Sequence, residues 1–201
     1  MSLVSHPAAL VLVDLQNAYF EVEPLRTERG RLTEAANELI GWARAAAVPV
    51  VNLRTEHQRD GSTWTLNMVE DQQGFAFAGN EDAQPLAGLR LEDAIDVVKT
   101  RDDGFLGTPL GDVVRGMSTL VIAGVSTHTC VAATAAHAYA ADLSVVLVHE
   151  AIASHRPDLH RPTLEMLSEE YRMPLMDVAS LVVGGLPDPR ERHRPAGGIQ
   201  L

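Results

Sequence analysis

The chain has 201 residues, and its 27 acidic and 16 basic side chains give a formal net charge of −11. This charge disfavours nucleic acid and anionic membranes as partners, since both bind clustered Lys and Arg. With 46% hydrophobic and 21% charged residues, the composition is typical of a soluble globular protein, and the length suits one domain with a single large core.

In chain order, apolar runs alternate with helical patterns. The predicted elements are a strand at 8–13, a helix at 32–47, strands at 48–53 and 93–98, a helix at 109–116, a strand at 120–123, a helix at 127–141, a strand at 144–149, a helix at 158–171 and a strand at 174–177. Such alternation indicates βαβ units. We therefore predict an α/β fold of three layers, α/β/α, with a central, mostly parallel six-stranded sheet and Rossmann-like topology.

The two ends of the chain and its cysteine content bear on domain organisation and location. Residues 1–7 contain no basic segment, and the apolar run 8–13 is too short to span a bilayer. A single cysteine forms no internal disulfide, so we expect a reducing, cytoplasmic location. We assign residues 1–183 to one domain and residues 184–201, rich in Pro, Gly and Arg, to a C-terminal tail.

Residues 54–88, between the second and third predicted strands, are polar and show little periodicity. Ordered loops of this length are usually functional. The loop carries three aromatic residues, Trp64, Phe75 and Phe77. Aromatic side chains beside strand ends suit a pocket wall, and we assign Trp64 to substrate binding; the alternative is a core or subunit contact.

Cys130 follows the apolar run 120–122 and begins the Ala-rich predicted helix. Free N–H groups and the helix dipole at such a position favour negative charge, which predicts a thiol pKa lowered toward the reactive thiolate. The alternative is a small buried hydrophobic residue. The strand–turn–helix setting favours a nucleophile.

Asp14 and Lys99 also directly follow predicted strands. In open α/β sheets, ligands bind beyond the carboxyl ends of the strands, where the strand order reverses. If these strands are neighbours, an acid, a base and the Cys130 thiol converge on one crevice. Alone, Asp14 could form an Asx turn and Lys99 could be a solvated surface side chain. Their joint occurrence at strand ends favours a site.

Three segments of the chain resemble the isochorismatase-like cysteine hydrolases, a family that includes nicotinamidases, N-carbamoylsarcosine amidases and isochorismatases. The matching segments are ALVLVDLQN at 9–17, VKTRDDGFLGTPL at 98–110 and GVSTHTCVAATA at 124–135. Their order and spacing hold over about residues 8–178. In the second segment, Asp102-Asp103-Gly104-Phe105 replaces the Ser-Ala-Phe that is more usual in the family, a change we expect to act only locally.

The resemblance implies a catalytic triad of Asp14, Lys99 and Cys130. In it the thiolate attacks an amide or urea carbonyl, and Asp14 takes the thiol proton and returns it to the leaving nitrogen. A cis peptide bond between Val125 and Ser126 is also implied, with an oxyanion hole formed by the N–H groups of Ser126 and Cys130. The predicted activity is cysteine-dependent hydrolysis of a C–N bond in a small amide, carbamoyl or ureido compound through a thioester.

Two departures from relatives in the family restrict this prediction. Nicotinamidases bind a metal through Asp-x-His and a further His after the second strand, where this chain has Glu56 and His57 without a second histidine nearby. We therefore predict no metal and no cofactor. Isochorismatases cleave a vinyl ether without needing the thiol, so Cys130 favours C–N hydrolysis and vinyl-ether hydrolysis is the alternative. A non-catalytic binding subunit would predict a damaged triad.

Further residues near strand ends are assigned to substrate binding. Arg54 and Arg101 could each pair with a substrate carboxylate or form a structural ion pair. Phe105 is expected to form a pocket wall, and His128 to lie near the pocket mouth. Gln16, within the first matching segment, is also assigned to the substrate.

The family resemblance also implies assembly, since its members are commonly dimers or tetramers. The loop aromatics, the Ala-rich helix faces and the tail offer more apolar surface than a lone domain usually exposes. We expect a homo-oligomer, with loop or tail residues reaching a neighbouring subunit.

Overall fold

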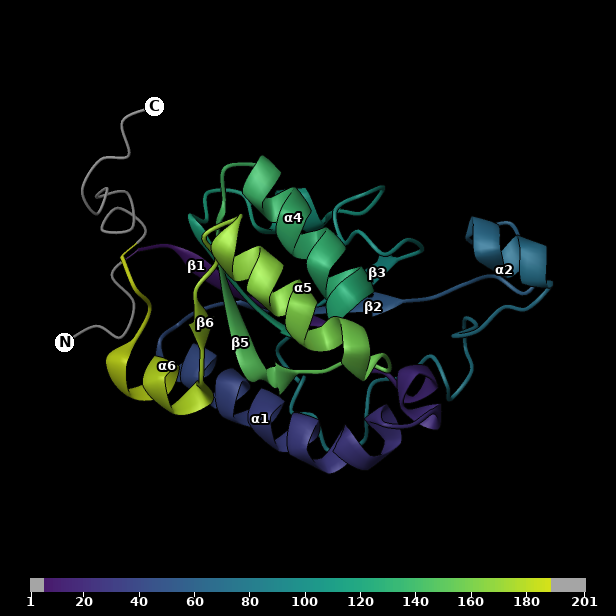
Figure 1. Cartoon of the computed structure of the whole chain (residues 1–201), viewed down its shortest axis with the longest axis horizontal. Coiled ribbons are helices and arrows are strands. Elements are labelled where there is room, and N and C mark those ends of the chain that lie inside the picture. Colours follow the sequence, from purple (N-terminus) through teal and green to yellow (C-terminus); the bar gives the residue numbers. More distant parts are fainter. Residues whose placement is uncertain (1–5, 189–201) are drawn as a thin grey trace.

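In the computed structural model, which describes residues 6–188, six strands form one sheet in the order β3-β2-β1-β4-β5-β6 (Figure 1). The strands are β1 (Ala8–Val13), β2 (Val50–Thr55), β3 (Ile95–Lys99), β4 (Thr119–Gly124), β5 (Ser144–Ile152) and β6 (Leu175–Met176). Every neighbouring pair is parallel. The predicted α/β fold with a six-stranded sheet is confirmed, and the sheet is parallel throughout.

The helical segments cover both faces of this sheet and also occur in its connections. They are η1 (Asn17–Glu21), α1 (Leu25–Ala45), α2 (Leu66–Asp71), α3 (Leu110–Val113), η2 (Thr127–Val131), α4 (Ala132–Ala140), α5 (Pro157–Glu169) and α6 (Val178–Gly184). Across residues 6–188, no helix has the length and apolar character needed to cross a membrane.

The sheet separates two apolar layers, because alternate side chains of a strand point to opposite faces. Leu10 of β1 packs in the layer that α1 and α6 cover, together with Leu39 and Leu181. Val11 packs in the layer of α3, α4 and α5, together with Ala135. All six side chains of β1 are buried, as expected for a central parallel strand covered on both faces.

The strand order reverses beside β1. The chain runs from β1 through β2 to β3 on one side and then returns to place β4 on the other side of β1. The carboxyl ends of β1 and β4 therefore flank the position where open α/β sheets bind ligands. Segment α2 does not cover the sheet; it lies in a lobe that projects beyond the end of β2 (Figure 1).

The predicted boundary between domain and tail falls inside ordered, packed structure. Helix α6 ends at Gly184, and Leu186 is buried in the same apolar layer as α1. Core packing thus continues past residue 184, where the tail was predicted to start. The remainder of the predicted tail, residues 189–201, lies outside the described residues.

Gly124 ends β4 with a φ of +127°, and a Cβ at this position would lie 2.0 Å from the carbonyl oxygen of Val13. We expect Gly124→Ala to lower the free energy of unfolding by about 2–6 kcal/mol, from backbone strain together with displacement of β1. Gly41→Ala is the control, since an added Cβ inside α1 meets nothing within 4 Å. It should be neutral or stabilise by up to about 1 kcal/mol. Equal effects in chemical denaturation would contradict this account.

Candidate active site

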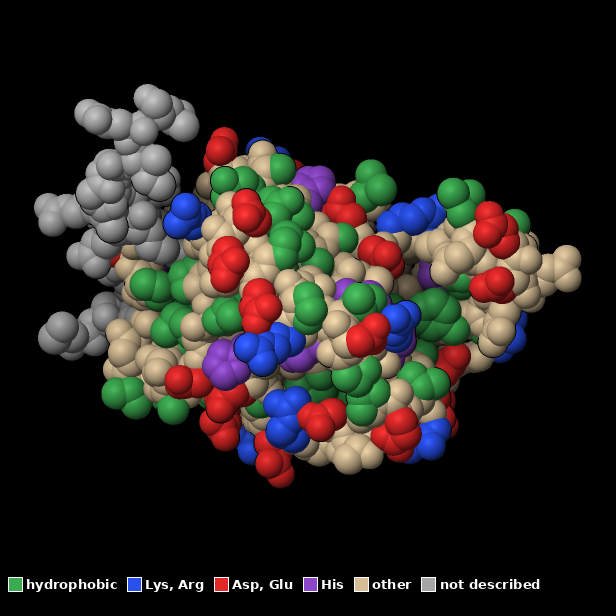
Figure 2. Space-filling view, in the orientation of Figure 1, with side chains coloured by type: hydrophobic (Ala, Val, Ile, Leu, Met, Phe, Trp, Pro, Cys, Tyr) green, Lys and Arg blue, Asp and Glu red, His purple; other side chains and the backbone are tan. Residues whose placement is uncertain are grey.

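A cavity of about 310 Å³ opens at the carboxyl ends of β1, β2 and β4. Cys130 and Ser126 line it from the turn after β4, Arg101 and Asp102 from the loop after β3, and Met68 from α2. Figure 2 shows a hollow between the body of the molecule and the lobe that contains α2. The cavity therefore lies at the point where the winding of the sheet reverses.

Asp14, Lys99 and Cys130 lie together behind this cavity. The Lys99 Nζ is 2.8 Å from Asp14 Oδ2 and 3.3 Å from Cys130 Sγ. The exposed fractions of Asp14, Lys99 and Cys130 are 0%, 1% and 3%. The acid, the ammonium and the thiol thus form one buried cluster, and the sulfur is the member that reaches the cavity wall.

The backbone turns sharply at Asp14 as the chain leaves β1. Asp14 has a φ of +51°, in the left-handed region that Asp and Asn adopt more readily than most residues. Its N–H still donates to the carbonyl of Leu53 in β2 at 2.8 Å. This turn ends the strand and brings the carboxylate toward Lys99.

Thr55, at the end of β2, links the cluster through its hydroxyl. The hydroxyl accepts hydrogen bonds from Lys99 Nζ at 2.7 Å and from the Tyr19 hydroxyl at 3.0 Å, and it donates to Asp14 Oδ1 at 2.9 Å. One donor and two acceptor sites are all that a hydroxyl offers, so Thr55 is fully used. Sequence analysis missed Thr55 because the second strand was predicted to end at residue 53.

The charges in this cluster hold Lys99 as an ammonium and Cys130 as a thiol. Although burial disfavours its charged form, the Asp14 carboxylate raises the pKa of Lys99 above its usual value. Burial and the Asp14 carboxylate raise the pKa of Cys130 well above its usual value, with Lys99 acting in the opposite direction. The predicted lowering of the thiol pKa is therefore wrong: a π-helical turn, η2, buries Cys130 beside Asp14.

Alkylation of Cys130 by iodoacetamide tests this resting state. Because the thiol is buried and protonated, labelling should be slow at neutral pH and accelerate well beyond the usual thiol pKa of about 8.5. Intact mass reports on this residue alone, since the chain has one cysteine. Rapid labelling that reaches its maximum below neutral pH would show a preformed thiolate instead.

The turn before the thiol carries the residues assigned to the oxyanion hole. The Val125–Ser126 peptide bond is cis, the isomer that the family resemblance implies. Within residues 6–188 the backbone N–H of Ser126 donates to no other group. The Ser126 hydroxyl forms a hydrogen bond with His155 Nδ1 at 3.0 Å, and both side chains line the cavity.

Two residues assigned to substrate binding instead hold the fold. The Gln16 amide donates to two backbone carbonyls and accepts from the Thr55 N–H, and the side chain is fully buried. Arg54 forms ion pairs with Asp96 and Glu56. Neither side chain lines the cavity, so a substrate contact is not supported for Gln16, and Arg54 takes its alternative role as a structural ion pair.

Three further assigned residues lie outside the cavity wall. Trp64 packs against Phe77 inside the projecting lobe, and Phe105 stacks on His137 with ring centroids 4.6 Å apart. His128 is hydrogen-bonded through Nδ1 to a serine hydroxyl. The ring of His128 lies 4.9 Å from that of His155, which lines the cavity, so His128 lies near the cavity as expected without forming its wall.

Arg101 does line the cavity, as assigned, and its guanidinium donates to the backbone carbonyl of Thr63 at 2.8 Å. Residues that sequence analysis missed also line it, among them Tyr19, Asp102 and His155. Asp102 could have been predicted from the sequence, because it lies in the same family-matching segment, residues 98–110, as Lys99. His155 was missed because β5 was predicted to end at residue 149.

Glu56 and His57, the residues weighed as metal ligands, face different partners. Glu56 is paired with Arg54, whereas His57 Nδ1 lies 3.0 Å from the Thr63 carbonyl oxygen. Burial lowers the pKa of His57, which favours a neutral ring. Over the described part of the chain, no three His, Cys, Asp or Glu side chains are grouped to hold a metal ion.

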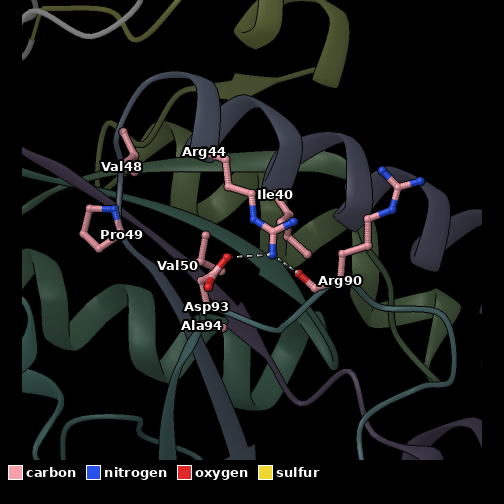
Figure 3. Close-up of a pocket in the computed structure, with 8 residues that line it drawn as sticks. All are labelled: Ile40, Arg44, Val48, Pro49, Val50, Arg90, Asp93 and Ala94. Carbon is pink, nitrogen blue, oxygen red and sulfur yellow. Dashed lines mark hydrogen bonds and ion pairs between the residues drawn. The ribbon is translucent and has the colours of Figure 1, made fainter.

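A smaller hollow lies at the amino ends of the strands, where β2 begins (Figure 3). Arg44 of α1 reaches into it and lies 3.0 Å from the Arg90 carbonyl oxygen and 3.5 Å from Asp93. The residues drawn in Figure 3 include no nucleophile and no histidine. This hollow therefore offers no group that could replace the thiol at the carboxyl ends of the strands.

Comparison with known sequences agrees with this geometry. The isochorismatase domain model matches residues 8–180. A protein of Arabidopsis thaliana named as a probable inactive nicotinamidase is 30% identical over 81% of this chain and 95% of its own length. A streptothricin hydrolase of Streptomyces noursei is 33% identical over 73% of this chain and 54% of its own, so the chain spans about half of that enzyme.

Solved structures show the same arrangement. An isochorismatase family protein of Desulfovibrio vulgaris superimposes with a TM-score of 0.79 and is 25% identical, over 88% of this chain and 97% of its own. The family match spans nearly all of the described residues, including the turn after β1, the end of β3 and the turn that carries Cys130. The chain is a hydrolase of the isochorismatase family.

Proposed function

We propose that this protein is a cysteine-dependent amidohydrolase that cleaves a C–N bond of a small non-peptide amide, carbamoyl or ureido compound. The observation that carries the proposal is the position of Cys130 Sγ, in the cavity wall and 3.3 Å from a Lys99 ammonium that is itself paired with Asp14. Two relatives of the chain are named as amidohydrolases, which supports the same bond type.

In the first half of the proposed reaction, Asp14 takes the thiol proton as Cys130 Sγ attacks the substrate carbonyl carbon. Lys99 stays protonated and stabilises both the carboxylate and the developing thiolate. The carbonyl oxygen becomes an oxyanion, which the N–H groups of Ser126 and Cys130 would stabilise. Asp14 then returns its proton to the leaving nitrogen as the C–N bond breaks, which leaves a thioester.

In the second half, water replaces the released ammonia or amine in the cavity. Asp14 takes a proton from this water, whose oxygen attacks the thioester carbon. The C–S bond breaks and Cys130 regains its proton from Asp14, so the enzyme returns to its resting state. The same carboxylate thus serves as base and acid in both halves.

A panel of small primary amides, carbamoyl compounds and ureas, assayed for ammonia release, tests this proposal. We expect at least one compound to be hydrolysed at a rate that Cys130→Ala abolishes. The alternative activity, vinyl-ether hydrolysis, needs no thiol. Turnover of a vinyl ether by both the wild type and Cys130→Ala, with no amide hydrolysed, would overturn the proposal.

We also propose that the protein is a homo-oligomer. Leu66 and Val69 of α2 are 84% and 55% exposed, on the lobe that projects from the body (Figure 1). Paired exposed apolar side chains are typical of surfaces that another chain covers. Light scattering at micromolar concentration should give a multiple of the chain mass of 21.7 kDa, and Leu66→Asp should reduce it. A monomer with full activity would contradict the expectation.

A further inference from the structure

Asp102 brings a second carboxylate to the nucleophile. It follows Lys99 on the loop after β3, and its Oδ1 lies 3.6 Å from Cys130 Sγ. Asp102 is exposed and lines the cavity, whereas Asp14 is fully buried and paired with Lys99. Across residues 6–188, no Lys, Arg or His side chain forms an ion pair with Asp102.

The cavity wall also contains one cationic side chain, Arg101, and two histidines, His57 and His155. Arg101 directs its guanidinium to the backbone carbonyls of Thr63 and Thr100. Burial lowers the pKa of His57 and of His155, so both rings favour the neutral form. Asp102 is the carboxylate of the cavity wall that contacts the sulfur, whereas the Arg101 guanidinium is directed to backbone carbonyls.

We propose that Asp102 selects substrates with a positive charge next to the scissile carbonyl group, such as small amides of amino-substituted acids, and disfavours a carboxylate at that position. Attack places the carbonyl carbon about 3–3.5 Å from the sulfur. That carbon then lies no more than about 7 Å from Asp102 Oδ1, because Oδ1 is 3.6 Å from the sulfur, so a charged substituent on it can reach the carboxylate. In a partly closed cavity, a cation there is attracted and an anion is repelled more strongly than in water. This inference rests on the proposed function for the identity of the substrate.

A cation beside Asp102 would also assist the nucleophile. Asp102 is one of the groups that raise the pKa of Cys130, after burial and Asp14. A substrate cation paired with Asp102 neutralises its charge, so Asp102 no longer raises the thiol pKa when the thiol must lose its proton. The net charge of −11 adds a long-range attraction for cations.

The rate at which charged and neutral reagents alkylate Cys130 measures the charge preference of the cavity without any substrate. The probes are iodoacetate, iodoacetamide and 2-bromoethylammonium, which are anionic, neutral and cationic. Each rate, followed by intact mass, is divided by the rate of a free model thiol. Because a changed thiol pKa scales all three rates alike, the ratios between probes report only on charge near the sulfur.

In the wild type we expect the cationic probe to be favoured over iodoacetate. Asp102→Asn should lower this preference by about tenfold, the effect of removing one unit charge a few ångströms away at a partly screened site. Asp103→Asn is the matched control, since Asp103 is paired with His137 and lies outside the cavity wall. It should behave as the wild type. A preference for iodoacetate, or equal ratios in all three proteins, would overturn the inference.

Hydrolysis of matched amides separates this inference from the proposed function. Ammonia release from β-alaninamide, propionamide and succinamate compares a cationic, a neutral and an anionic compound, and we expect kcat/KM to fall in that order. If Cys130-dependent hydrolysis occurs with ratios that Asp102→Asn leaves unchanged, the inference fails and the proposed function stands. If the alkylation ratios change as expected but no amide is hydrolysed, the proposed function fails and the charge preference stands.

Discussion

Cys130→Ala is expected to reduce amide hydrolysis by a factor on the order of 10⁴ or more, because no other group can form the thioester. The sulfur lies in the cavity wall beside Lys99, and the described residues include no second cysteine. The substitution removes one small buried atom, so the free energy of unfolding should change by about 1 kcal/mol or less. Ammonia release and chemical denaturation measure the two effects independently.

Cys130→Ser is the matched control for this loss. Its hydroxyl keeps a polar group beside Lys99 but is a much weaker nucleophile, so activity should remain close to that of Cys130→Ala. Intact mass of the wild type mixed with a slow substrate should show an added acyl group that both variants lack. Hydrolysis at wild-type rates by both the serine and the alanine variant would show that the thiol is dispensable and that water attacks the substrate directly.

The alternation of apolar runs was enough to predict the sheet, because strands buried on both faces need continuous apolar sequence. Strand β1 has the predicted bounds, and the other strands overlap their predicted ranges. The segments η1, α2 and α6 were not predicted. Short or exposed helices such as α2, where Leu66 faces solvent, have no apolar stripe that reveals them.

The cluster of Asp14, Lys99 and Cys130 could be predicted because parallel strands bring their carboxyl ends to one edge. The wall of the cavity could be predicted only in part: Arg101 lines it as assigned, but other assigned side chains are held elsewhere by partners distant in sequence. Arg54 meets Asp96, and Phe105 meets His137, through contacts that only the folded chain creates.

The electrostatic environment of Cys130 also could not be predicted from the sequence. The position of Cys130 between a strand and a helix predicts a lowered thiol pKa. In the structure, burial and the Asp14 carboxylate outweigh the effect of the helix terminus and raise that pKa. The burial of Cys130 depends on the π-helical turn η2 and on the packing of segments distant in sequence, which the strand–turn–helix pattern does not specify.

Asp14→Asn should separate the two effects of the carboxylate, which the proposed reaction needs for proton transfer but which opposes thiolate formation. Asparagine tolerates the left-handed backbone at this position and can still accept from Thr55, so the fold should persist. Hydrolysis should fall by about 10³-fold or more because the base is lost. Labelling by iodoacetamide at neutral pH should accelerate instead, since Asp14 raises the thiol pKa and Lys99 lowers it.

Lys99→Met is the comparison variant for Asp14→Asn, because it removes the opposite charge of the same ion pair. It removes the cation that favours the thiolate, so labelling at neutral pH should slow further while hydrolysis is also lost. It also leaves the Asp14 carboxylate buried without its partner, which should cost about 3–5 kcal/mol of stability. Faster labelling together with lost hydrolysis in Asp14→Asn would show that the carboxylate is needed for a step other than exposing the thiolate, as the proposed role of Asp14 as the base requires. If labelling slowed in Asp14→Asn as well, the carboxylate would instead be needed to hold the sulfur in position.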